Sequence, residues 1–242
     1  MTTAALATGG WMVALLAALL ALAARSQLRR RLEWISRASH ELRGGIGAVR
    51  LGLAVAAPGR PLGTLQLRAV ELELDRAVLA LQELDGGPVG WAFEYIDVFE
   101  LLAESVEASR PAAAVHGAEL GLRWSGEPAA VIGDRVRVAQ AISNLIANAI
   151  EHGGGAVEVC GASVGEAVRI EVLDGGPGLP KPVAELTRDR RGQRGRGLGL
   201  RIAADIVAGH GGRLSAAPSV GGARLMLELP APPGLQEQWR AS

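Results

Sequence analysis

Two stretches of the chain carry apolar residues at the three- and four-residue spacing of an amphipathic helix. The first runs from Leu28 to Leu53. The second consists of Leu67, Val70, Leu74, Val78 and Leu81. A Pro- and Gly-rich segment, 57–63, separates them, so we predict an antiparallel helical hairpin over 26–87. One hairpin has too small a core to be stable alone, and we therefore expect two copies to pair into a homodimeric four-helix bundle.

Residues 3–24 carry no charged side chain. A helix of this length spans about 33 Å, enough to cross a hydrocarbon core of about 30 Å. We predict a single-pass transmembrane anchor over 1–25. A cleaved signal peptide is the competing interpretation, but Arg25 and the arginines at 29–31 follow the apolar run instead of preceding it. The same arginines place the N-terminus outside and the rest of the chain in the cytoplasm.

Beyond the hairpin, the pattern changes to short strands that alternate with helices. We predict helices over 97–117, over 133–153 and after Gly199, and strands over 118–124, 156–164, 167–174 and in a last hairpin over 212–230. This order predicts an α/β two-layer sandwich over 88–231, with antiparallel strands on one face and helices on the other. The chain as a whole is thus expected to be α+β, and 232–242 to be a flexible tail.

The charge balance narrows the possible functions. With 25 basic and 25 acidic residues the formal net charge is zero, which argues against a nucleic-acid partner, because such binders carry a basic excess. Cys160 is the only cysteine, so no intrachain disulfide supports the fold.

His40 and Glu41 form a polar pair on the first predicted helix. At about 100° per residue, His40 lies about 140° from Ile35 and about 160° from Leu42, so it faces away from the apolar stripe. A plain coiled-coil linker explains the stripe but does not require this pair. A neutral imidazole suits a nucleophile, because the neighbouring carboxylate can hold or remove its proton.

Further polar residues gather on the long helix predicted over 133–153. Asn144, Asn148 and His152 follow one another at one-turn spacing and share a face. Amides are poor helix formers, so two stacked asparagines suggest a role such as binding a hard cation through their carbonyl oxygens.

Two Gly-rich segments follow. "DGGPG" at 174–178 ends a predicted strand, and its glycines let the backbone approach a flat ligand while Asp174 accepts hydrogen bonds. "GRGLGL" at 195–200 opens a helix, where free backbone N–H groups favour a phosphate. The basic "RDRRGQR" between them is placed to fold over a polyphosphate.

Together, "SHELR", "GDRVRVAQAI", "NLIANAIEH", "DGGPG" and "GRGLGL" resemble, in order and spacing, the phosphoacceptor, N, G1 and G2 boxes of bacterial sensor histidine kinases. The resemblance covers about 29–230. It implies a dimerisation and histidine-phosphotransfer hairpin followed by an ATP-binding domain of the GHKL (Bergerat) type. A membrane-bound kinase in the bacterial cytoplasmic membrane is therefore expected, with ATP and Mg²⁺ as cofactors and a separate response regulator as partner.

The resemblance also implies roles for individual residues. His40 accepts the γ-phosphoryl group, and Glu41 is its acid/base neighbour. Asn148 holds Mg²⁺, and Asn144 lines the catalytic side, where hydrolytic relatives place a glutamate nearby to activate water. The remaining residues implied in nucleotide binding are His152, Asp174, Gly176, Gly178, Gly195, Gly197, Leu198 and Gly199.

The chain departs from the family pattern at Gly44 and Gly45, where Thr or Asn and then Pro are usual. The residue at the first of these positions is thought to orient water, so phosphatase activity is in doubt. The segment between the Gly-rich boxes is short and contains no Phe. Arg194 or Arg196 is a candidate phosphate contact there.

Two alternatives stay open at this point. One is a GHKL serine kinase or ATPase with the same pocket, against which stands the hairpin that bears His40. The other is a membrane-tethered ATP-binding scaffold whose kinase activity has decayed. Gly44, Gly45 and the short segment, or lid, between the two Gly-rich boxes favour this alternative.

Overall fold

The computed structural model describes residues 63–86, 90–188, 198–219 and 221–231, together with Leu22 and Arg25. Nearly all of the predicted anchor, the first hairpin helix and the predicted tail lie outside these residues. Among the helices in the described ranges, none is both long enough and apolar enough to cross a bilayer.

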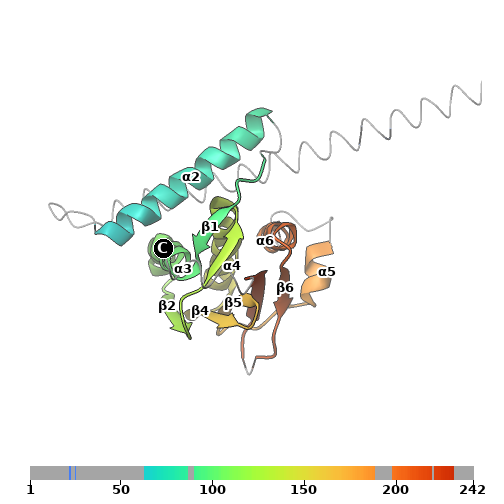
Figure 1. Cartoon of the computed structure of the whole chain (residues 1–242). Coiled ribbons are helices and arrows are strands. Elements are labelled where there is room, and N and C mark those ends of the chain that lie inside the picture. The colour runs from blue at the N-terminus through green and yellow to red at the C-terminus, as the bar shows by residue number, and fades with distance from the viewer. Residues whose placement is uncertain are drawn as a thin grey trace, which may run out of the picture.

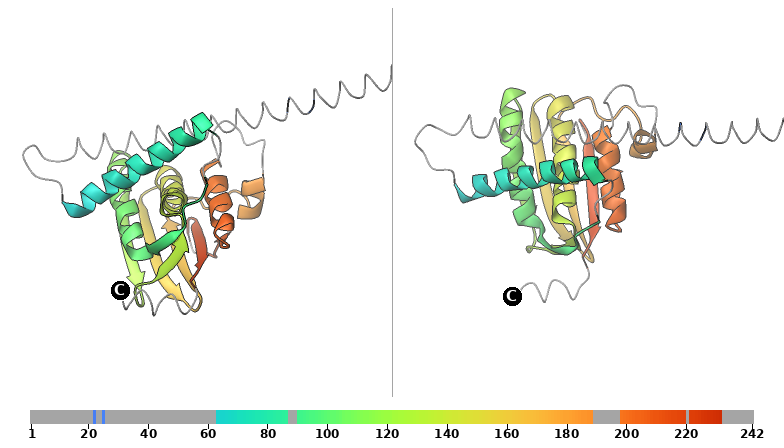
Figure 2. Two further views of the ribbon diagram at one scale, coloured as in Figure 1. Left: turned by 45° about the horizontal axis from the view of Figure 1, so that its top comes forward. Right: turned by 90° about the horizontal axis from the view of Figure 1, so that it is seen from above.

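The described elements form three layers (Figure 1). One outer layer is a five-stranded sheet in the order β2-β4-β5-β7-β6. Its strands are β2 (Glu119–Ser125), β4 (Ala156–Val164), β5 (Ala167–Asp174), β6 (Arg213–Ala216) and β7 (Arg224–Pro230). Above it lie α3 (Val98–Val115), α4 (Arg135–His152) and α6 (Leu198–Gly209), and α2 (Thr64–Gly86) crosses above α3 and α4 (Figure 2). The short helix α5 (Val183–Arg188) flanks α6.

Apolar alternation in the strands builds the core between sheet and helices. Inward-facing residues of β4, β5 and β7 are buried, among them Val159, Ile170 and Leu227. Leu101 and Leu102 of α3 and the apolar face of α4 cover them. Burial of this continuous apolar surface is the main driving force for the sandwich.

Local sequence signals start the two long helices. Asp97 caps α3 by accepting a hydrogen bond from the Glu100 backbone N–H at 3.0 Å, and Asp134 caps α4 through the Arg137 N–H at 3.1 Å. A two-stranded antiparallel ribbon of β1 (Glu94–Asp97) and β3 (Ala130–Gly133) leads into both caps.

One part of the predicted sheet is wrong: the strands are not all antiparallel, because β2 pairs with β4 in parallel. The chain passes from β2 through β3 and the whole of α4 before it enters β4. A helical crossover of this kind returns the chain to the edge from which it started, so the two strands run in the same direction.

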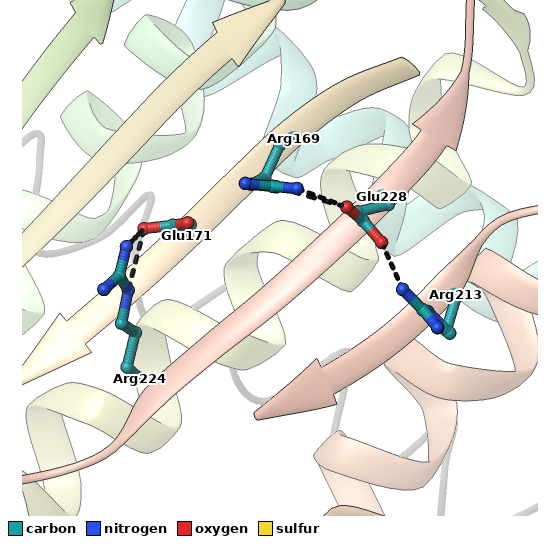
Figure 3. A network of polar contacts seen from close by, with 5 residues as sticks. All are labelled: Arg169, Glu171, Arg213, Arg224 and Glu228. Atoms are coloured by element: carbon teal, nitrogen blue, oxygen red, sulfur yellow. Dashed lines mark hydrogen bonds and ion pairs between the residues drawn. The ribbon is translucent and has the colours of Figure 1, made fainter. Parts of the chain in front are cut away.

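The open face of the sheet carries cross-strand ion pairs (Figure 3). Glu228 on β7 bonds Arg213 at 2.8 Å and Arg169 at 2.9 Å, and Glu171 on β5 bonds Arg224 at 2.6 Å. Arg213, and after it Arg169, lower the pKa of Glu228. Opposite charges on facing strands stabilise the sheet register at this face.

The second predicted hairpin helix is present as α2. It packs on the sandwich with a different face from the one that carries its apolar stripe. Ala69, Leu72 and Ala80 are buried where α2 packs against α3 and α4, whereas Leu67, Leu74, Val78 and Leu81 are exposed. Whether the exposed stripe pairs with another helix depends on residues outside the described ranges. The hairpin and its dimer therefore remain predictions.

Charged side chains join α2 to the sandwich. Arg68 of α2 forms an ion pair with Glu100 of α3 and lies 4.0 Å from the carboxylate of Glu104. Glu104 is fully buried and also pairs with Arg135 at the start of α4. Three helices thus meet at one buried carboxylate, which needs both cations because an unpaired buried charge is costly.

Candidate functional site

One helix carries three of the predicted site residues. Asn144, Asn148 and His152 lie at one-turn spacing on α4, with increasing exposure toward its C-terminus. Asn144 is only 8% exposed, Asn148 is half-buried and His152 is exposed. The predicted shared face is therefore present, and it runs from the interior to the surface.

Asn144 meets the first turn of α6. A Cβ atom placed on Gly199 would lie 3.5 Å from Oδ1 of Asn144, an ordinary contact distance. Nδ2 of Asn144 is buried and has no hydrogen-bond partner among the described residues. A buried amide in this state is unusual and needs a partner, such as a ligand or bound water.

Asp174 ends β5 and joins two loops to the sheet. Its Oδ1 accepts hydrogen bonds from the backbone N–H groups of Gly176 at 2.9 Å and Ala223 at 3.0 Å. Its own N–H donates to the Ala223 carbonyl at 3.0 Å. Within the described part of the chain, Oδ2 accepts no hydrogen bond, so this oxygen is available to a ligand.

Three glycines allow the backbone segments around Asp174 to approach one another. A Cβ at Gly176 would clash with the carbonyl oxygen of His152, and one at Gly153 would clash with the Cβ of Asp174. Gly222 has a φ of 75°, and a Cβ there would clash with the carbonyl oxygen of Asp174. The end of α4, the end of β5 and the loop before β7 therefore meet at one place.

The structure thus brings together Asn144, Asn148, His152, Asp174, Gly176 and Gly199, from segments that are distant in sequence. Gly178, with a φ of 82°, lies on the same loop, and a Cβ there would lie 3.3 Å from the Gly222 carbonyl oxygen. Leu198 begins α6, although its side chain is not described. His40, Glu41, Gly195 and Gly197 lie outside the described residues.

Sequence reasoning missed Gly153, Gly222 and Ala223 as parts of this site. The "HGGG" after the long helix and the "GG" in the last hairpin were the available signals. Neither is specific, because glycines are common in turns, and only the fold places them beside Asp174.

The arrangement suits an anionic, flat ligand. The N-terminus of α6, a helix of 12 residues, offers unpaired backbone N–H groups and a positive dipole end beside Asn144. Asp174 offers a carboxylate oxygen to a hydrogen-bond donor, and Asn148 offers an amide to a cation. Anion, donor and cation sites on one face are what a nucleotide with its metal ion requires.

Comparisons with known proteins agree with this chemistry. Residues 133–233 match the family of histidine kinase-, DNA gyrase B-, and HSP90-like ATPases. The chain is 29% identical to the signal transduction histidine-protein kinase BaeS of Escherichia coli (strain K12) over 231 residues, 88% of this chain and 49% of BaeS. It is 31% identical to the sensor-type histidine kinase PrrB of Mycobacterium tuberculosis (strain ATCC 25618 / H37Rv), over 80% of this chain and 46% of PrrB. The chain thus spans about half the length of these relatives.

Solved structures share the fold. The catalytic domain of histidine kinase ThkA matches with a TM-score of 0.54 at 24% identity, over 60% of this chain and 99% of that one. The mycobacterial sensor histidine kinase MprB matches with a TM-score of 0.51 at 28% identity, over 58% of this chain and 99% of that one. The predicted two-layer sandwich of the GHKL type is confirmed.

Proposed function

We propose that the chain is a bacterial two-component sensor histidine kinase, which phosphorylates His40 with ATP and passes the phosphoryl group to an aspartate of a separate response regulator. The observation that carries this proposal is the convergence of α4, Asp174 and the N-terminus of α6 on one face. These are the three parts that a nucleotide pocket of this family needs.

The nucleotide base lies at Asp174 in this proposal. Oδ1 of Asp174 is already engaged by two backbone N–H groups, so Oδ2 accepts the exocyclic amine of adenine. His152 flanks the base or sugar, and Gly176 and Gly178 let the loop lie close to the ring. The phosphates lie toward Gly195, Gly197 and Gly199 at the start of α6, where backbone N–H groups and the helix dipole neutralise their charge.

The residues present also fit Mg²⁺. The half-buried Asn148 offers an amide oxygen, the kind of hard ligand that Mg²⁺ takes beside phosphate oxygens. The unpartnered Nδ2 of Asn144, one turn earlier, is a donor available to a bound phosphate or water. When bound, the ion neutralises the charge on the transferred phosphoryl group.

His40 completes the reaction on the hairpin. A ring nitrogen forms a bond to the γ-phosphorus, the bond from phosphorus to the β,γ-bridging oxygen breaks, and ADP leaves. Glu41 takes or holds the proton on the other ring nitrogen. Asn144 favours transfer over hydrolysis, because an amide cannot act as the general base that activates water.

The same proposal covers the membrane location of the chain and its assembly as a homodimer. The uncharged run 3–24 supports a single-pass anchor in the bacterial cytoplasmic membrane, with the kinase in the cytoplasm. The exposed stripe of Leu67, Leu74, Val78 and Leu81 supports a homodimer through the hairpin. A solvated stripe of this kind on a 23-residue helix is an unfavourable exposed surface without a partner.

Nucleotide binding and label chemistry together test the proposal. The full chain in detergent is titrated with ATP and Mg²⁺ and then incubated with γ-labelled ATP. We expect ATP binding and a label that is stable to alkali and lost in acid. A label stable to acid would indicate a serine kinase, and binding without any label would favour the scaffold.

A further inference from the structure

Aromatic residues are rare in this chain but concentrated in one short segment. Of its eight Trp, Tyr and Phe residues, Trp91, Phe93, Tyr95 and Phe99 lie within nine positions. Phe93 is 53% exposed and Tyr95 57% exposed. Such exposure of large aromatic groups favours a role in binding another surface.

Six exposed large apolar residues lie at one end of the sandwich, and we call them the end patch: Trp91, Phe93, Tyr95, Phe99, Ile132 and Val164. All six are exposed by more than a third. Tyr95 and Ile132 face each other across the β1-β3 ribbon. Apart from Leu22, Leu65, Val115 and the stripe on α2, the end patch contains all the exposed large hydrophobic residues of the described chain.

The end patch lies at the end of the sandwich opposite the candidate site. Asp174 is the last residue of β5, whereas Ala167, its first residue, pairs with Val164 of β4 and Pro230 of β7. The β3-α4 junction is also at this end, because α4 runs from Arg135 there to His152 beside Gly176. The patch therefore plays no part in the pocket.

The chain leaves the sandwich at this same end. The Ala231 N–H donates to the Glu166 carbonyl at 2.8 Å, two residues beyond Val164. Pro230 lies 3.8 Å from the position of a Cβ on Gly211, next to His210. The ring of His210 lies 5.4 Å from that of Phe93 and 4.7 Å from that of Trp91. A continuous path of contacts thus joins the exit point to the patch.

The eleven residues after Ala231, "PPGLQEQWRAS", contain two large apolar side chains, Leu235 and Trp239. Their spacing of four places both on one face of a helical turn. Eleven residues reach up to about 36 Å when extended, nearly three times the length of the four-residue strand β1. Arg240 follows Trp239, and Glu94, between Phe93 and Tyr95, is exposed and of opposite charge.

We propose that residues 232–242 fold back onto the end patch, with Leu235 and Trp239 packed against Tyr95 and Ile132. The segment they cover connects α2 to α3. The docked tail thus holds that connection against the sandwich and restrains the position of α2, and this inference rests on the fold, independently of the proposed function.

Cysteine cross-linking tests the docking in the full chain, in a Cys160→Ser background. The test pair is Glu94→Cys with Arg240→Cys, which leaves Tyr95 and Trp239 intact. The control pair is Glu71→Cys, at an exposed position on α2, with Arg240→Cys. We expect the test pair to form an intramolecular disulfide at least tenfold faster than the control pair, measured as the loss of maleimide-reactive thiols in the monomer band.

Replacing both anchors, Leu235→Ala with Trp239→Ala, separates docking from simple tethering. We expect this change to reduce the test-pair rate to that of the control pair. Equal rates in the two pairs, or a fast rate that survives loss of both anchors, would overturn the proposal. A disulfide formed only between chains would assign the end patch to a second copy instead and would overturn it as well.

Discussion

Gly222 lies in direct contact with Asp174: its φ is 75°, and a Cβ at this position would overlap the Asp174 carbonyl oxygen. The neighbouring Ala223 N–H holds the Asp174 carboxylate at 3.0 Å. The orientation of the carboxylate thus depends on Gly222 and Ala223, which lie 48 and 49 positions later in the chain.

We predict that Gly222→Ala displaces Asp174 and lowers ATP affinity more than tenfold. The residue would be strained at positive φ, at a cost of about 1–3 kcal/mol, in addition to the clash. Gly221→Ala is the matched control, because a Cβ there meets nothing within 4 Å. Isothermal titration of both variants with ATP measures the difference, and equal affinities would argue against this geometry.

The two faces of α2 predict different effects for two neighbouring leucines. Leu72 is 1% exposed against the sandwich and Leu74 is 51% exposed. We expect Leu72→Ala to weaken the packing of α2 on α3 and α4 by about 2–5 kcal/mol, the usual cost of a core truncation. Hydrogen exchange in α2 and α3 measures this loss.

Leu74→Ala serves as the counterpart. It should leave exchange in α3 unchanged and weaken self-association of the chain, which sedimentation at several concentrations measures. If Leu74→Ala instead increased hydrogen exchange in α3 as much as Leu72→Ala does, the assignment of the two faces of α2 would be incorrect.

The buried ion pair between Glu104 and Arg135 predicts a loss of stability that a second substitution can reverse. Arg135→Ala removes one cation from a fully buried carboxylate, and we expect a loss of about 3 kcal/mol, at the lower limit for a broken buried pair because Arg68 remains. Adding Glu104→Leu removes the buried carboxylate that has lost its closer cation and should restore most of the stability. Chemical denaturation of the single and double variants checks both statements, and no recovery in the double variant would contradict them.

The lowered pKa of Glu228 predicts that the stability of the fold depends on pH in the acid range. Its pKa in the folded protein lies below the unfolded value of 4.5, so its ionised form stabilises the fold above that pH. This contribution is lost as the pH falls through the folded pKa. We expect Glu228→Gln to reduce the dependence of the melting temperature on pH below about 4.5, with little effect near pH 7, since exposed ion pairs contribute roughly 0–1 kcal/mol. An unchanged acid profile would show that Arg213 and Arg169 do not hold the carboxylate.

Long elements were predictable because they carry many periods of a pattern. The range 133–153 predicted for the long helix matches α4 within two residues, and Asn144, Asn148 and His152 lie on it as expected. The β1-β3 ribbon was missed because four residues per strand show no periodicity. The six-residue helix α5, within the segment that the sequence suggested as a lid, was missed for the same reason.

Contacts between distant segments were the least predictable. The hydropathy of α2 reveals its leucine stripe but not the face formed by Ala69, Leu72 and Ala80, since alanines give little contrast with polar neighbours. The parallel pairing of β2 and the position of Gly222 beside Asp174 likewise depend on how the chain crosses the sheet. The sequence is enough to assign each motif to a helix, strand or loop, whereas only the fold shows which motifs are in contact.

Transfer of label from γ-labelled ATP to His40 tests the central claim most directly. The full chain is incubated with Mg²⁺ and labelled ATP beside His40→Gln and Asn148→Ala. The account predicts an acid-labile, alkali-stable label on the wild type and none on either variant. His40→Gln lacks the acceptor, and Asn148→Ala lacks the amide on α4. A label of unchanged intensity on His40→Gln would contradict it.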